Sequence, residues 1–190
     1  MSGQIDFLES RTVFKGRLLE VVVDRVRFPD GREMQWESVH HPGAAAVVPV
    51  DADGRVLLVR QTRHTVGKRL LEVPAGKLDR VGEDPADCAR RELIEETGYR
   101  CGTLTGLTSV LASPGFSDER IHLFLATELT PVGRPDDTDE GDDIEIEWLS
   151  MAEAQQAVRD GQIEDAKTAL CILLATGHPV AEASPNGRTR

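Results

Sequence analysis

Three glutamates at helical spacing constrain this chain more than any other feature of its sequence. Glu92, Glu95 and Glu96 lie in the run from Arg91 to Tyr99 at spacings of i, i+3 and i+4, which put all three carboxylates on one face of an α-helix. Such crowded like charges have two interpretations. They form a solvated acidic face, or they bind a hard divalent cation such as Mg²⁺, which prefers carboxylate and phosphate oxygens. The three glutamates alone leave both interpretations open.

The start and the apolar side of this helix can also be predicted. Asp84 and Pro85 are favoured residues at the cap and at the first position of a helix. Ala86, Ala89 and Leu93 then fall on the face opposite the glutamates. We therefore expect a helix that packs through one side and presents its carboxylates on the other.

The segment that contains this helix resembles the signature of the Nudix hydrolases, G-x5-E-x7-R-E-U-x-E-E-x-G-U, in which U is a bulky apolar residue. The chain departs from the signature once, because six residues rather than five separate the glycine from the first glutamate. This insertion falls in a loop, so it lengthens a turn without moving the helical carboxylates. The matching residues are Gly76, Glu83, Arg91, Glu92, Leu93, Glu95, Glu96, Gly98 and Tyr99.

The resemblance implies hydrolysis of a diphosphate that is linked to another moiety, with Mg²⁺ as the cofactor and Mn²⁺ as a substitute. It implies that Glu92, Glu96 and the backbone carbonyl of Ala75 hold the metal, which would neutralise the diphosphate and activate a water molecule. We expect Arg91 to point away from the face of Glu92. Its expected role is an ion pair with Glu95 at i+4 that holds this catalytic carboxylate in place.

Residues outside the signature resemble the ADP-ribose pyrophosphatase branch of the family. Arg63 and Glu72 lie in segments similar to that branch, and the resemblance implies that Arg63 contacts the diphosphate. Pro114 and Gly115 follow the signature at a similar spacing, although Pro-Gly is also a generic turn dipeptide. Arg60 is either part of the same site or a charge at a sheet edge.

The first 42 residues resemble a small β-sheet found in this branch. There, the sheets of two subunits are swapped in a two-fold symmetric homodimer and help to bind adenine. Trp36 and Glu37 resemble the aromatic and acidic residues of that sheet, because an indole ring offers a stacking face for a base. The alternative for Trp36 is an aromatic residue in the core of the dimer. His41 stands where some relatives carry an arginine.

A second acidic segment, residues 136–147, contains eight carboxylates. Such a run is usually a solvated loop, but in the ADP-ribose branch a glutamate at this place deprotonates the attacking water. We assign that role to Glu140 and a role as an outer metal ligand to Asp142. Glu145 and Glu147 alternate with apolar residues, which predicts the solvent side of a strand.

The pattern of elements predicts one main α/β domain at residues 43–178, preceded by the antiparallel β-sheet of residues 1–42 and followed by a loose tail at 179–190. Short links between strands favour a mixed sheet with helices on both faces, in agreement with the α/β/α sandwich of the Nudix resemblance. We expect strands over 19–26, 33–39, 44–50, 56–59, 70–73, 104–111, 121–128 and 144–149, and later helices over 150–161 and 165–176.

Composition narrows the classes of partner. The net charge of −11 argues against a nucleic-acid surface, because phosphate backbones need neutralisation by lysine and arginine. No apolar run is long enough for a membrane span, and the first residues lack the features of a signal peptide. Three scattered cysteines give no disulfide framework. These features favour a cytoplasmic protein.

The sequence therefore predicts a Mg²⁺-dependent ADP-ribose diphosphatase that forms AMP and ribose 5-phosphate and acts as a domain-swapped homodimer. Two alternatives stay open. One is a hydrolase of another nucleoside diphosphate sugar or of a dinucleotide such as NADH. The other is a Nudix-fold sensor that binds a nucleotide without cleaving it, although intact glutamates at positions 92, 95 and 96 argue against it.

Overall fold

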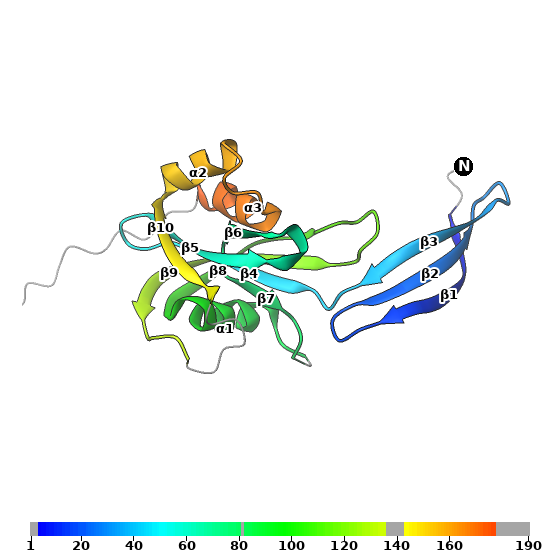
Figure 1. Ribbon diagram of the computed structural model, residues 1–190, viewed down its shortest axis with the longest axis horizontal. Helices are drawn as coiled ribbons and strands as arrows, with labels where there is room; N and C mark the ends of the chain where they lie inside the picture. Colours follow the sequence, from blue (N-terminus) through cyan, green and yellow to red (C-terminus); the bar gives the residue numbers. More distant parts are fainter. Residues whose placement is uncertain (1–3, 81, 136–142, 178–190) are drawn as a thin grey trace, which may run out of the picture.

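A three-stranded sheet projects from a larger layered body in the computed structural model, which describes residues 4–80, 82–135 and 143–177 (Figure 1). The projecting sheet has the order β1-β2-β3, and the body contains the sheets β10-β5-β6 and β7-β4-β9-β8. The strands are β1 Asp6–Lys15, β2 Glu20–Arg27, β3 Glu33–His40, β4 Ala44–Pro49, β5 Arg55–Arg63, β6 Lys68–Glu72, β7 Ala75–Lys77, β8 Tyr99–Leu111, β9 Arg120–Pro131 and β10 Glu145–Ser150. The helices are α1 Pro85–Thr97, α2 Met151–Arg159, α3 Ala166–Ala175 and the short 3₁₀ helix η1 His64–Val66.

Strand β4 is the centre of the body. It pairs in parallel with β9 and antiparallel with β7, so the sheet is mixed. All six residues of β4 are buried, because both faces of the strand are covered. Ala46 and Val48 belong to the core on the side of α2 and α3, whereas Ala45 and Val47 pack with α1 (Figure 1). The predicted α/β/α sandwich is confirmed.

Helix α1 begins and ends where the local signals predict. The Asp84 carboxylate accepts a hydrogen bond from the Ala86 N–H at 2.8 Å. Gly98 ends the helix in the left-handed region, with φ of 73°, and donates its N–H to the Ile94 carbonyl. Ala89 and Leu93 are fully buried against the sheet, which fixes the orientation of the opposite, acidic face.

The two later helices are also capped by their own side chains. Ser150 and Glu153 form the reciprocal capping box of α2. Asp165 caps α3 and accepts hydrogen bonds from the backbone N–H and the hydroxyl of Thr168. Within the described ranges, none of the helices is long and apolar enough to cross a bilayer.

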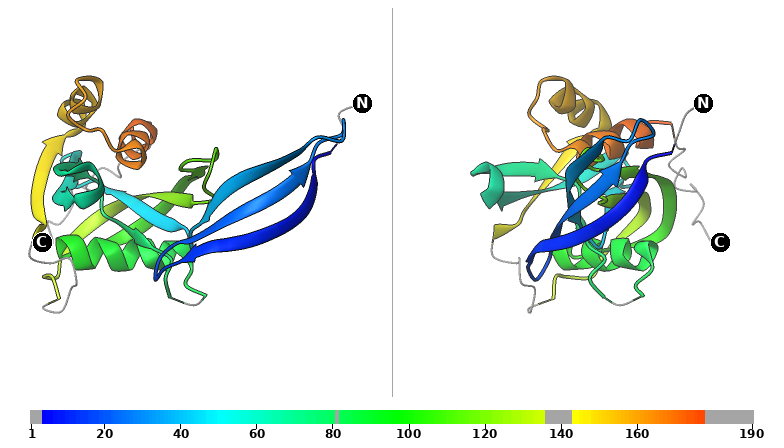
Figure 2. Two further views of the ribbon diagram at one scale, coloured as in Figure 1. Left: turned by 45° about the vertical axis from the view of Figure 1, so that its right-hand side comes forward. Right: turned by 90° about the vertical axis from the view of Figure 1, so that its right-hand side faces the viewer.

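The projecting sheet differs from the body because little of the protein covers it (Figure 2). Phe7 and Phe14 of β1 are 65% and 57% exposed. The sheet joins the body beside the β8–β9 turn, where the Val39 N–H donates to the Phe116 carbonyl and the Asp118 N–H donates to the Val39 carbonyl. Strand β1 was not among the predicted strands, since its apolar residues stand in adjacent pairs rather than in alternation, and pairing with β2 holds it.

Candidate active site

A cavity of about 820 Å³ lies where α1, β7 and the start of α3 meet. Its walls carry both signs of charge, with the carboxylates on α1 and basic residues around them. The charged lining residues are Arg63, Lys77, Asp79, Arg80, Arg91, Glu92, Glu95, Glu96, Glu119, Asp165 and Lys167. Such a cavity suits a ligand that is itself multiply charged.

Glu92 and Glu96 lie against the backbone of β7 rather than on a solvated helix face. Glu96 is only 3% exposed, and its Oε2 accepts a hydrogen bond from the Ala75 N–H at 3.2 Å. A β-carbon built on Gly76 would lie 1.8 Å from Glu92 Oε1, so the chain can approach this carboxylate only because residue 76 is glycine. The interpretation of the glutamates as a solvated surface is therefore wrong.

Arg91 connects three carboxylates. Its guanidinium donates to Glu83 Oε1 and to Glu95 Oε2, both at 2.9 Å, so the expected ion pair with Glu95 is present. It also lies 2.5 Å from Glu92 Oε1, and the expectation that it points away from Glu92 is wrong. The long arginine side chain reaches back to its neighbour, which the helix periodicity of the Cα positions does not reveal. The hydrogen bond from Arg91 lowers the pKa of Glu83.

Two cations of the cavity wall, Arg63 and Lys167, hold a buried carboxylate between them. Glu72 is 1% exposed and accepts two hydrogen bonds from Arg63, at 2.8 and 2.9 Å. Lys167 Nζ of α3 lies 2.5 Å from Glu72 Oε2. Burial alone raises the pKa of Glu72, but the hydrogen bond from Arg63 and the charge of Lys167 outweigh it, so the pKa lies below its ordinary value.

Sequence reasoning identified Arg63 and Glu72 but missed Lys167, which is 95 residues from Glu72. One signal was available. Residues 166–175 read Ala-Lys-Thr-Ala-Leu-Cys-Ile-Leu-Leu-Ala, so a single charged residue stands in the first turn of an otherwise apolar helix. A lysine in such a place needs an acidic partner or a ligand.

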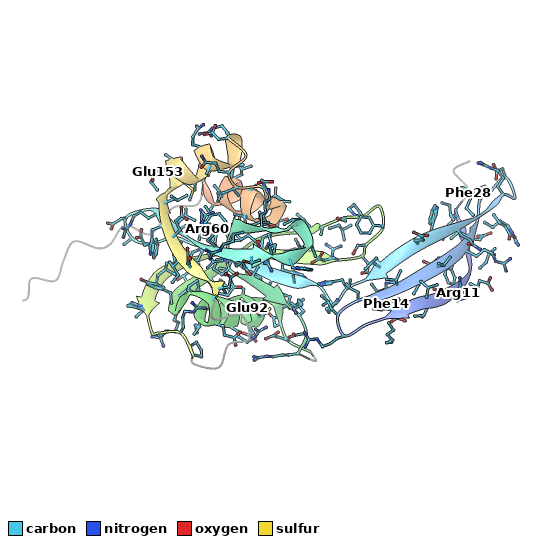
Figure 3. All side chains as sticks on the ribbon, in the orientation of Figure 1. Arg11, Phe14, Phe28, Arg60, Glu92 and Glu153 are labelled. Atoms are coloured by element: carbon cyan, nitrogen blue, oxygen red, sulfur yellow. The ribbon has the colours of Figure 1, made fainter. Side chains whose placement is uncertain are left out.

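Five predicted substrate-binding residues are absent from the lining of the cavity: Trp36, Glu37, Glu72, Pro114 and Gly115. Trp36 is 43% exposed and packs edge-on against Phe28, with ring centroids 6.0 Å apart. Figure 3 shows Phe28 at the far end of the projecting sheet, well separated from Glu92 in the body. Pro114 and Gly115 lie in the exposed turn between β8 and β9, although Ala112 and Glu119 on either side of them do line the cavity.

None of the three remaining candidates, Glu140, Asp142 and Arg60, can be placed in the lining of the cavity. Glu140 and Asp142 lie outside the described residues. Ile144, two residues further along, lines the cavity. Arg60 pairs with Glu147 of the neighbouring strand at 2.8 Å and does not line the cavity. It lies on β5, the central strand of its sheet, so its interpretation as a charge at a sheet edge is wrong.

Comparison with known proteins identifies the family. Residues 39–169 match the family model of the NUDIX domain. The chain belongs to the Nudix family. An ADP-ribose pyrophosphatase from Bacillus subtilis (strain 168) is 39% identical over 170 residues, which cover 87% of this Nudix chain and 91% of that protein. An ADP-ribose pyrophosphatase from Mycobacterium tuberculosis (strain ATCC 25618 / H37Rv) is 42% identical over 156 residues, or 82% of this chain and 75% of that protein.

Two further comparisons extend the picture of this Nudix protein. A methanol dehydrogenase activator from Bacillus methanolicus is 38% identical over 165 residues, or 87% of this chain and 89% of that protein. A crystal structure of an ADP compounds hydrolase superposes with a TM-score of 0.81 at 22% identity, covering 93% of this chain and 94% of that one. At this sequence identity, the structural similarity shows that the two proteins share a fold.

Nudix hydrolases generally use divalent metal ions, and the oxygen atoms around β7 fit such an ion. Glu92 and Glu96 supply carboxylate oxygens, which hard cations prefer, and the backbone at Ala75 and Gly76 touches both side chains. Among the described residues, no three acidic, histidine or cysteine side chains converge on one point. An ion at this place would therefore share two carboxylates with backbone and substrate oxygens, as Mg²⁺ commonly does.

Proposed function

We propose that this Nudix protein hydrolyses the diphosphate linkage of ADP-ribose to AMP and ribose 5-phosphate with Mg²⁺ as its metal. The observation that carries the proposal is the cavity in which carboxylates suited to a metal face basic side chains suited to phosphate. Two relatives that are 39% and 42% identical to most of this chain are ADP-ribose pyrophosphatases. Together they support both the reaction and the substrate.

The residues of the cavity divide the work between them. Glu92, Glu96 and the backbone at Ala75 would hold the metal, which supplies charge neutralisation and an activated water when bound. Arg91 holds Glu95 and Glu92 in fixed positions through its guanidinium. Arg63 would bind the diphosphate, because a guanidinium matches phosphate geometry with two parallel donors.

The assignment of the base rests on resemblance alone. Glu140, with Asp142 as an outer metal ligand, lies in a segment outside the described residues. A base acts in the transition state, so Glu140→Gln is expected to lower kcat far more than it raises KM. An unchanged kcat would move the role to another carboxylate of residues 136–147.

The projecting sheet supports the proposal that the protein acts as a domain-swapped homodimer. Its exposed aromatic and apolar side chains exceed what a solvated sheet needs, and the predicted adenine ligands Trp36 and Glu37 lie on it rather than at the cavity. A second copy would cover these side chains and complete the site of its partner. Sedimentation velocity is expected to give the mass of two chains, and a monomer at micromolar concentration would contradict this part of the proposal.

Incubation of the purified protein with ADP-ribose and Mg²⁺ tests the proposed reaction. AMP and ribose 5-phosphate are separated by chromatography, and parallel reactions contain ADP-glucose, NADH and a nucleoside triphosphate. We expect ADP-ribose to be hydrolysed to AMP faster than any of the other three compounds is hydrolysed. Preferred cleavage of another compound would keep the chemistry and overturn the substrate, and binding of ADP-ribose with no cleavage of any compound would favour a nucleotide sensor.

A further inference from the structure

Glu72 is a buried carboxylate with more positive charge beside it than one ion pair requires. It is 1% exposed at the end of β6, with Arg63 of β5 on one side and Lys167 of α3 on the other. A buried charge must be paired and hydrogen-bonded, and the two hydrogen bonds from Arg63 already do so. Lys167 also pairs with Asp165 at 2.9 Å, so the four charges balance and the lysine links Glu72 to the cap of α3.

The side chains of Arg63 and Lys167 bind the same oxygen atom of Glu72. Arg63 Nη2 donates to Glu72 Oε2 at 2.9 Å, and Lys167 Nζ lies 2.5 Å from the same oxygen. Two donors on one oxygen fix where the carboxylate lies, and a fixed carboxylate in turn fixes the guanidinium that chelates it. Arg63 and Lys167 both line the cavity, so this fixed geometry faces the ligand.

Lys167 is itself held rigidly. Its Nζ lies 2.9 Å from Asp165 Oδ1, and Asp165 is the cap of α3. The hydroxyl of the next residue, Thr168, accepts a hydrogen bond from the Val73 N–H at 2.9 Å, which ties the first turn of α3 to the residue that follows Glu72. Both Lys167 and Thr168 are well buried. The start of α3 is therefore a rigid support for the carboxylate.

We infer that Lys167 is a positioning residue that acts through Glu72 to hold Arg63 in the orientation that binds the diphosphate of the substrate. The inference rests on the proposed function, because Arg63 is assigned to the diphosphate there. It assigns a role to the C-terminal helix, which contributes no residue to the Nudix signature. Lys167 thus sets substrate affinity through Arg63 and leaves the chemical step to the carboxylates of α1.

A double-mutant cycle between Lys167 and Arg63 tests this role with ADP-ribose as substrate. We expect Lys167→Gln to raise KM about tenfold with kcat changed by less than about twofold, since a charged hydrogen-bond partner is lost from ground-state binding. In an Arg63→Gln background the same change is expected to have little further effect, because both variants disable one unit. Lys167→Arg keeps the charge and is expected to restore most of the affinity.

Lys68 provides a matched control. It pairs with Glu164 at 2.6 Å and links the start of β6 to the segment before α3, so it joins the same parts of the chain as Lys167. Lys68 does not line the cavity, and its ammonium group binds Glu164. Lys68→Gln is expected to leave KM and kcat unchanged. If Lys167→Gln does not fold, Lys167→Met, which keeps the apolar stem, replaces it in the cycle.

Two results would overturn the inference. Additive effects of the two substitutions would mean that Lys167 acts on the substrate independently of Arg63, and an unchanged KM in Lys167→Gln would leave it a packing role only. The same cycle is run with the Kd of ADP by calorimetry, which requires no turnover. If the wild type fails to hydrolyse ADP-ribose, the proposed function is wrong, while coupling or additivity in the Kd for ADP still decides the role of Lys167.

Discussion

The body and the projecting sheet of this protein bury their strands to very different extents. All six residues of β4 in the body are buried, whereas nine of the ten residues of β1 in the projecting sheet are exposed. The body has a core on both sides of its central sheet. The body thus has a two-sided core of its own, whereas a three-stranded ribbon with little cover is expected to gain most of its stability from whatever packs on it.

The two regions also differ in how precisely the proposed reaction needs their side chains to be held. Charged groups must be held within a fraction of an ångström to act together, and the carboxylates and their partners lie in the region with a double-sided core. The predicted adenine contacts lie on the projecting sheet, where a small change in angle matters less to the chemical step. Substitutions in the body and in the projecting sheet should therefore affect different kinetic constants.

The largest effect is expected at the carboxylates of α1. Glu92→Gln and Glu96→Gln remove charge at the proposed metal site, and each is expected to lower kcat by about 100- to 1000-fold. Steady-state kinetics at saturating Mg²⁺ measure the change, and thermal unfolding checks the fold. Asp87→Asn, at an exposed position on the same helix, is the control and is expected to keep full activity. A near-wild-type rate in either glutamine variant would place the chemistry elsewhere.

The same substitution in the two regions is expected to have unequal effects on stability. Val48 is 0% exposed in β4 and Val13 is 46% exposed in β1. Val48→Ala is expected to lower the free energy of unfolding by about 2 kcal/mol, and Val13→Ala by less than about 0.5 kcal/mol in the monomer. Urea unfolding at two protein concentrations measures both. Equal losses that do not depend on concentration would contradict the contrast between the regions.

Trp36 tests the function of the projecting sheet. Trp36→Ala is expected to raise KM for ADP-ribose about tenfold and to leave kcat nearly unchanged, since loss of base stacking weakens binding alone. Sedimentation velocity in parallel reports any change in the dimer. Lys15→Ala, at an exposed position of the same sheet, is the control. An unchanged KM together with unchanged sedimentation would exclude Trp36 from both proposed roles.

The smallest effect is expected at the junction of the two regions. His40 Nδ1 lies 2.6 Å from Asp118 Oδ2, and this hydrogen bond raises the pKa of His40 above its ordinary value of 6.5. A raised pKa means that the folded state favours the protonated form, so the stabilisation is complete below about pH 6.5 and is lost as pH rises through the folded-state pKa. Both side chains are about half exposed, which limits the effect to about 0.5 kcal/mol.

Thermal unfolding between about pH 5.5 and pH 8.5 measures this contribution. His40→Gln is expected to make the unfolding temperature decrease less as the pH rises across that range. His64→Gln, at an exposed position in η1, is the control and is expected to keep the wild-type profile. An identical profile for the wild type and His40→Gln would show that the pair does not stabilise the junction.

Local sequence signals predicted the elements that carry the site. The cap of α1 and the positions of α2 and α3 were foreseen, because a capping side chain acts within three residues of the backbone group that it satisfies. Strands β1 and β7 were not among the predicted strands. The strand β8 begins at Tyr99, directly after the helix, rather than at residue 104. Tyr99 and Cys101 alternate with the exposed Arg100 and Gly102 over too few residues to predict a strand, and pairing with β9 orders them.

The sequence by itself determined the fold class, the acidic face of α1 and the glycine beside it, since helical spacing and the Nudix signature are local patterns. Only the docking of the elements shows that Arg91 also contacts Glu92 and Glu83, that Glu72 meets Lys167, and that Trp36 lies outside the cavity. Such contacts depend on how elements dock and where long side chains reach. Periodicity carries no information about either.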